Sequence, residues 1–306
     1  MAQSAIDALT ADPLDADTIE LLGFLYAKEG ADPVQLIQQG KFEKTLEVLN
    51  SVITNMRTEV IGYTTPSHMD VIIFCHYGRF VEIDKSQNLW RDGTTGLPLR
   101  FKEQPCRGGT FIENIALAVT MNPEDAHPAF KNNVQLESRR PTQIQLCPWF
   151  VDWVKSKKFK LVGDVQKRTK IGRFVIKLAE WKGFGLAQID AYSLLDKVLL
   201  HEMTHGRGAY ELRKNNNKKL EQQGLLDVPS ANSFFKSIEW AAYGWKGAMK
   251  IAKTGDDLGG NHAPDNNADT IALLGSVCKL MNHESEPRKV DSKGRIVPRA
   301  AATATR

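Results

Sequence analysis

Residues 189–205 read IDAYSLLDKVLLHEMTH. The stretch predicts a helix because its leucine and valine residues recur at a spacing of three to four. It ends in the motif HEMTH, which separates His201 from His205 by four residues. Side chains at that interval lie on one helix face, a turn apart, where two imidazoles can share one metal ion. The apolar run before the motif would hold both rings rigidly, which favours a metal site over two incidental histidines.

Glu202 stands beside the first histidine and has the chemistry of a general base. A carboxylate there need not bind the metal, because it can take a proton from water during attack on a carbonyl and deliver it to the leaving amine. Zn²⁺ suits this chemistry because it lowers the pKa of a bound water to about 7. Catalytic zinc normally takes three protein ligands, so a third ligand is expected downstream of His205.

Two later segments, AAYGW at 241–245 and NNADTIALL at 266–274, follow HEMTH in an order that resembles the deuterolysin-like aspzincins. These are fungal metalloendopeptidases that include lysine-specific enzymes, and the resemblance covers roughly residues 140–282. It implies that Tyr243 donates a hydrogen bond to the developing oxyanion. It also implies that Asp269 faces a substrate cation, although an aspartate there is equally suited to capping the helix that follows.

The third zinc ligand departs from the family's pattern. The family places an aspartate three residues before the tyrosine, and here that position is Trp240. Glu239, one residue earlier, is the first candidate, because a local bulge or its longer side chain could replace the aspartate. Glu211 competes, because HEMTHGRGAYE also fits the metzincin spacing HExxHxxGxxE, in which a glycine permits a sharp turn. The less favoured candidates are Asp227 and His262.

The order of elements predicts an α+β fold, with a zincin-like catalytic domain whose small sheet lies beside the HExxH helix. Residues 1–62 are expected to form a helical N-terminal region and residues 63–282 the metallopeptidase domain. Within that domain, β-like runs are predicted at 69–75, 109–121 and 142–150, and helices at 189–205, 230–252 and 267–281. The charged tail, 283–306, is expected to be disordered.

The composition narrows the partners. The chain has 306 residues, of which 40 are basic and 36 acidic, for a formal net charge of +4. That balance gives no reason to expect nucleic acid or an anionic membrane as a partner. Residues 1–30 lack the features of a signal peptide, and no window is apolar enough to span a bilayer, so we expect a cytoplasmic protein, secreted only if a leader was removed. The four cysteines are then expected to be reduced, with two disulfides as the alternative if a leader was removed. The oligomeric state does not follow from the sequence.

Three functions fit these patterns. The first is a zinc metalloendopeptidase that cleaves polypeptides with Glu202 as the general base. The second is an intracellular zincin-fold enzyme that acts on a small molecule in a biosynthetic pathway, which the missing leader and the altered third-ligand motif favour. The third is a non-catalytic zinc-binding module, against which the intact Glu202 argues.

Overall fold

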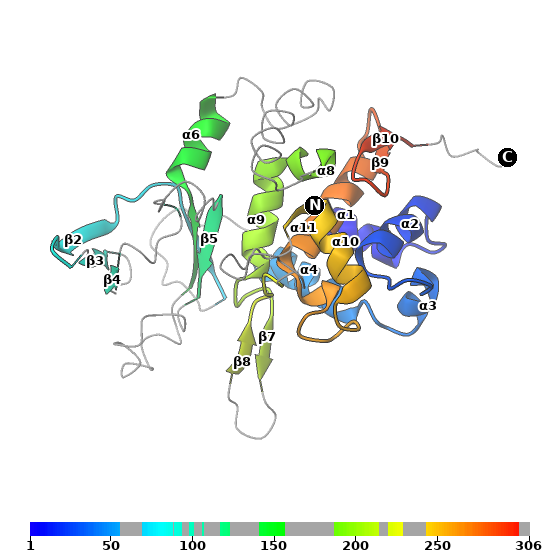
Figure 1. Ribbon diagram of the computed structural model, residues 1–306, viewed down its shortest axis with the longest axis horizontal. Helices are drawn as coiled ribbons and strands as arrows, with labels where there is room; N and C mark the ends of the chain where they lie inside the picture. Colours follow the sequence, from blue (N-terminus) through cyan, green and yellow to red (C-terminus); the bar gives the residue numbers. More distant parts are fainter. Residues whose placement is uncertain are drawn as a thin grey trace. The chain divides into compact units, whose positions relative to one another are not determined.

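A computed structural model describes residues 1–55, 69–87, 89–93, 98–100, 106, 117–122, 141–156, 187–213, 220–228 and 243–299 (Figure 1). Helices and small sheets are mixed along the chain, so the protein belongs to the predicted α+β class. It divides into two compact units. The first is made of Met1–Asn50, Leu161–His201 and Leu225–Arg306, and the second of Ser51–Lys160 and Glu202–Gly224.

Helix α11 (Ala268–Met281) is the core of the first unit. Every residue of this helix except Lys279 is buried, as expected for a helix that is covered on all sides. It contacts helices α1 (Ala2–Thr10), α2 (Ala16–Leu25), α8 (Gln188–Ala191) and α10 (Gly244–Thr254) and strand β9 (Arg288–Val290). The unit also contains α3 (Pro33–Gln38), most of α4 (Glu43–Asn55), most of α9 (Leu194–Thr204) and the short 3-10 helix η5 (Pro264–Asn266).

The predicted boundary near residue 62 does not separate the N-terminal helices from the rest. Helices α1 and α2 belong to the same unit as α10 and α11 and contact them directly. The reason is that the apolar face of α2, with Leu21, Leu22 and Leu25 buried, needs a partner. The sequence pattern showed that face but not the helices that cover it.

The predicted disorder of the C-terminal tail is wrong for residues 288–299. Strand β9 and strand β10 (Ile296–Pro298) form an antiparallel hairpin. Its charges are paired with helix α2, since Lys289 Nζ lies 2.9 Å from Asp17 and 2.8 Å from Glu20, while Arg299 Nε lies 2.8 Å from Asp17. A prediction of disorder from composition treats such charges as solvated, because composition gives no information on ion pairs with distant residues.

The second unit contains a sheet with strand order β1-β6-β5. Strand β1 (Val71–Phe74) pairs in parallel with β6 (Thr142–Leu146), which pairs antiparallel with β5 (Ala118–Met121). These strands confirm the β prediction for residues 71–74, 118–121 and 142–146 of the three runs, although residues 109–116 lie outside the described ranges. The prediction is wrong for residues 148–150, which are helical. Helix α6 (Pro148–Ser156) follows β6 and begins at a proline, a residue suited to the first helical position.

Two further strand groups of this unit were not predicted. Strands β2 (Phe80–Asp84), β3 (Leu89–Asp92) and β4 (Pro98–Arg100) form an antiparallel sheet, and β7 (Glu211–Arg213) pairs with β8 (Leu220–Gln223). Val81 and Ile83 are exposed on β2. Without a strict alternation of buried and exposed apolar residues, such short strands carry little periodic signal.

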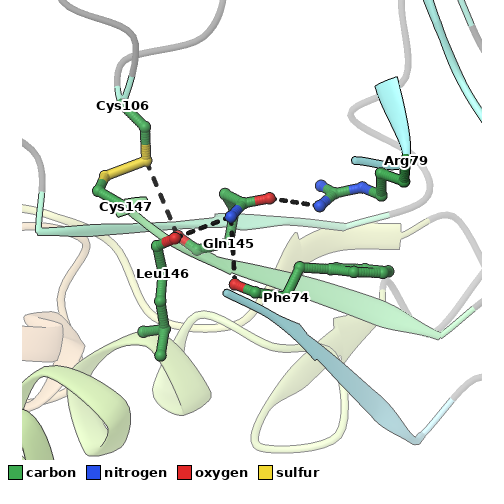
Figure 2. The surroundings of a disulfide bond; sticks show 6 residues. All are labelled: Phe74, Arg79, Cys106, Gln145, Leu146 and Cys147. Atoms are coloured by element: carbon green, nitrogen blue, oxygen red, sulfur yellow. Dashed lines mark hydrogen bonds between the residues drawn. A yellow bond between two sulfur atoms is a disulfide. The ribbon is translucent and has the colours of Figure 1, made fainter. Parts of the chain in front are cut away.

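Cys106 and Cys147 form a disulfide at the end of strand β6 (Figure 2). The expectation of four reduced cysteines is therefore wrong for this pair, although Cys278 is a free buried thiol and Cys75 a free exposed one. Next to the disulfide, the Gln145 amide donates hydrogen bonds to the carbonyls of Phe74 (3.1 Å) and Leu146 (2.8 Å). Widely spaced cysteines do not reveal which pair the fold brings together.

Among the helices in the described ranges, none combines the length and the apolar composition that crossing a membrane requires.

Candidate metal centre

The HEMTH motif lies at the end of helix α9. The predicted single helix over 189–205 is broken at Ser193, whose φ of 44° separates α8 from α9. His201 and Glu202 are buried in the last turn of α9, and His205 follows directly after the final helical residue, Thr204. The His205 amide donates to the Glu202 carbonyl at 3.2 Å, a turn tighter than the α-helix.

His201, His205 and Asp227 form a group of possible metal ligands. Each offers one ligand atom, and the three atoms lie within 4.8 Å of one another. Asp227 Oδ1 is 3.3 Å from His201 Nε2, and the Asp227 side chain is 34% exposed. Two imidazoles and one carboxylate are a donor set that catalytic zinc commonly takes, with one coordination position left for water or substrate. The residues present therefore fit the predicted Zn²⁺.

Asp227 is fixed by the backbone on either side of it. The amide of Leu226 donates to the Asn266 carbonyl at 2.9 Å, and the Leu226 carbonyl accepts from the Ala268 amide at 3.0 Å. The Val228 amide donates to Asn267 Oδ1 at 3.2 Å. These bonds join the segment to the start of α11, so the position of the Asp227 backbone is set by the core helix of the first unit.

Thr120 holds the predicted general base. Its hydroxyl on strand β5 lies 2.6 Å from Glu202 Oε2 and 2.9 Å from the Glu202 carbonyl oxygen. The same strand is followed by Asn122, whose amide donates to the His205 carbonyl at 2.8 Å. Within the second unit, strand β5 therefore orients both Glu202 and the backbone of His205.

Tyr243 lies beside the group of ligands, at the N-cap position of helix α10. Its hydroxyl donates to Asp227 Oδ2 at 2.9 Å, and its ring centroid is 5.6 Å from that of His201. The side chain is 47% exposed. A phenol in this place can turn its hydroxyl to a substrate oxygen, which is the chemistry that the predicted role requires.

Asp269 has a different position from the one predicted. Its carboxylate is buried and not open to a substrate cation: Oδ1 lies 3.5 Å from His201 Nδ1, and Oδ2 accepts from the Gly244 amide. The side chain of Asn267, the N-cap residue of α11, makes no capping hydrogen bond. The Asp269 carboxylate contacts His201 and the Gly244 amide instead, so the alternative role of helix cap does not apply either. Burial alone raises the pKa of Asp269, but Lys197 and His201 outweigh it and hold that pKa below its ordinary value.

The other third-ligand candidates are not in this group as far as the structure describes them. Glu239 lies outside the described residues, with most of the helix predicted over 230–252. Glu211 faces Arg207, with 3.5 Å between its carboxylate and the guanidinium. His262 is exposed and lies 3.5 Å from Asp256.

Asp227 is a less favoured candidate from the sequence because the aspzincin pattern places the third ligand just before Tyr243. The sequence does carry a local signal, since Asp227 follows Leu225 and Leu226 and precedes Val228, which are all apolar. An aspartate inside an apolar segment is expected to bind a cation or a hydrogen-bond donor, because an ionised carboxylate is costly to bury alone.

Comparisons of the chain with protein-family models, with curated proteins and with solved structures found no match.

Proposed function

We propose that the protein is a zinc-dependent metalloendopeptidase with a zincin-like site, in which His201, His205 and Asp227 hold the metal. The observation that carries the proposal is the approach of these three ligand atoms to within 4.8 Å, next to a carboxylate that Thr120 holds in place. Asp227 takes the role that the sequence pattern gave first to Glu239.

Zn²⁺ bound by these residues would supply a Lewis acid that polarises a carbonyl and makes water acidic near neutral pH. Glu202 takes the proton from the attacking water and passes it to the leaving amine, so that one water molecule is added across the C–N bond. The Tyr243 hydroxyl, 2.9 Å from Asp227, donates a hydrogen bond to the oxygen that becomes negative during attack.

The position of strand β5 favours a polypeptide over a small molecule. Within the described residues, β5 is at the edge of its sheet and pairs only with β6. The strand also carries Thr120, whose hydroxyl is bonded to the proposed general base. An extended peptide that added to this edge would be held by main-chain hydrogen bonds and would pass close to Glu202.

The test is hydrolysis of an unfolded polypeptide such as casein by the zinc-loaded protein. We expect cleavage that a chelator abolishes and zinc restores, and we expect Glu202→Gln to reduce it by at least about 10³-fold while zinc remains bound. Glu29→Gln, an exposed glutamate, is the matched control and should keep full activity. Zinc binding without cleavage would overturn the peptidase proposal and favour the small-molecule enzyme.

A further inference from the structure

Helix α9 carries a buried lysine one turn before the first histidine of the motif. Lys197 is four residues before His201, so both side chains lie on one face of the helix. Lys197 is 7% exposed. Its Nζ lies 3.9 Å from Asp269 Oδ1 and 3.7 Å from Asp190 Oδ1. A lysine is rarely buried unless it is paired, and here it stands between two carboxylates.

Both carboxylates are buried and tied to the backbone. Asp190 is 3% exposed and Asp269 is 4% exposed. Asp190 accepts from the amides of Trp245 at 2.8 Å and Ala187 at 2.6 Å, and Asp269 accepts from the Gly244 amide. The two carboxylates that face the Lys197 ammonium come from α8 and α11. The amides of Gly244 and Trp245, at the start of α10, hold these carboxylates in place.

Stability alone does not explain why Lys197, Asp190 and Asp269 are buried together. Removing charges from water costs about as much as their attraction returns, so a buried ion pair is often no more stable than an apolar replacement. The cluster does reach the metal site, because the same Asp269 Oδ1 that faces Lys197 lies 3.5 Å from His201 Nδ1. A metal-ligating histidine commonly donates its second ring N–H to a carboxylate, which fixes the orientation of the ring.

We propose that Lys197, backed by Asp190, is a positioning residue for the metal ligand His201. By holding Asp269 Oδ1, Lys197 directs the Asp269 carboxylate to accept the Nδ1–H of His201, which leaves Nε2 facing Asp227. This inference rests on the proposed function in one respect, namely that His201 Nε2 binds the metal. It assigns Asp269 to the orientation of the ligand in place of the predicted contact with substrate.

The structure offers a matched control for the loss of a lysine. Lys279 on α11 pairs with Asp196 on α9 at 2.7 Å, so it joins the same two helices, but both side chains are 38% exposed. The variants are Lys197→Met, Lys279→Met and the pair Asp190→Asn with Lys197→Met. The double variant removes one charge of each sign, so it is expected to fold even if Lys197→Met alone does not.

Two measurements test the inference. The first is zinc affinity by competition with a chelator, and the second is the nitrogen-attached proton of His201 Nδ1, observed by ¹⁵N-edited NMR of the metal-free protein. We expect the double variant to lose about 10- to 100-fold in zinc affinity and its Nδ1 proton to be lost to solvent exchange. Lys279→Met should keep the zinc affinity within about twofold of the parent protein and should keep the Nδ1 proton.

A folded double variant with unchanged zinc affinity and an unchanged Nδ1 proton would overturn the inference. Failure of the proposed function gives a different result, because a parent protein that binds no zinc would still report the Nδ1 proton. In that case, an Nδ1 proton that is protected in the parent and lost in the double variant supports the positioning role of Lys197. An Nδ1 proton that is equally protected in both proteins contradicts that role.

Discussion

Among the described residues, the Thr120 hydroxyl orients Glu202. Thr120 Oγ1 lies 2.6 Å from Glu202 Oε2 and 2.9 Å from the carbonyl oxygen of the same residue. A hydroxyl has one proton, and donation to the ionised carboxylate gives the stronger bond. In the proposed reaction this bond fixes one carboxylate oxygen and leaves the other to accept the proton of water.

Replacing Thr120 by valine should therefore damage catalysis more than substrate binding. A lost hydrogen bond to a charged group costs about 1.5 to 3 kcal/mol, so Thr120→Val should lower kcat by roughly 10- to 100-fold with little change in KM. Thr120→Ser keeps the hydroxyl and should keep most of the activity. Steady-state kinetics on a fluorogenic peptide measure both parameters, and equal kcat values for the valine and serine variants would contradict the assignment.

At the scale of elements, the turn after strand β8 packs against the segment that carries His205. Gly224 has a φ of 65° and its amide donates to the Tyr210 carbonyl at 2.8 Å. A Cβ atom at this position would lie 1.8 Å from the His205 carbonyl oxygen. The turn therefore needs glycine for two reasons, its left-handed backbone and its close approach to the ligand-bearing segment.

Gly224→Ala should weaken zinc binding as well as the fold. A left-handed backbone alone costs an alanine about 1 to 2 kcal/mol, and the collision with the His205 carbonyl adds a displacement of that segment. Gly30→Ala is the matched control, because Gly30 also has a positive φ, 82°, but has no atom within 4 Å of its added Cβ. We expect both variants to unfold at lower urea concentration and only Gly224→Ala to lose zinc affinity. Equal zinc affinities in the two variants would argue against the role of this turn.

The hairpin β9–β10 should make stability depend on pH through Asp17. Burial raises the pKa of Asp17, but hydrogen bonds from Lys289 and Arg299 outweigh it and lower the pKa below its ordinary 3.8. A carboxyl whose pKa is lowered by folding stabilises the protein above that ordinary value, and the contribution is lost as the pH falls through the folded-state pKa. Asp17→Asn should therefore reduce the free energy of unfolding by about 1 kcal/mol at pH 7.

Urea unfolding of both proteins at pH 7 and at pH 3 measures this effect. The difference between parent and Asp17→Asn should narrow as the pH is lowered, because the parent loses the ionised carboxyl. Glu29→Gln, which changes an exposed glutamate, should show no difference at either pH. A difference that is the same at both values would contradict the ion-pair explanation.

At the scale of the whole molecule, helices and strands with a strong periodic pattern can be predicted from the sequence. Features that depend on pairing between distant residues cannot. The N-terminal helices, the strands in 69–75 and 142–150 and the helix over 267–281 follow from local spacing. The hairpin at 288–298, the Cys106–Cys147 disulfide and the assignment of the N-terminal helices to the α11 unit depend on partners far away in the sequence.

The candidate site divides in the same way. HEMTH predicts His201, Glu202 and His205 as site residues because they lie within five consecutive residues, although His205 follows the last helical residue of α9. Asp227 comes from a segment that is placed by hydrogen bonds to Asn266, Asn267 and Ala268, and no spacing rule from His205 encodes those bonds. The burial of Asp269 against His201 likewise depends on the contact between α11 and α9, which the sequence does not reveal.

The zinc content of ligand variants tests the central claim most directly. Purified protein, equilibrated with excess Zn²⁺ and desalted, should retain one zinc per chain by elemental analysis, and so should Glu239→Gln and Glu211→Gln. Asp227→Asn should retain less than about one tenth of that amount, because loss of one of three ligands sharply lowers affinity. Full zinc in Asp227→Asn, with loss of zinc in Glu239→Gln or Glu211→Gln, would contradict the site formed by His201, His205 and Asp227.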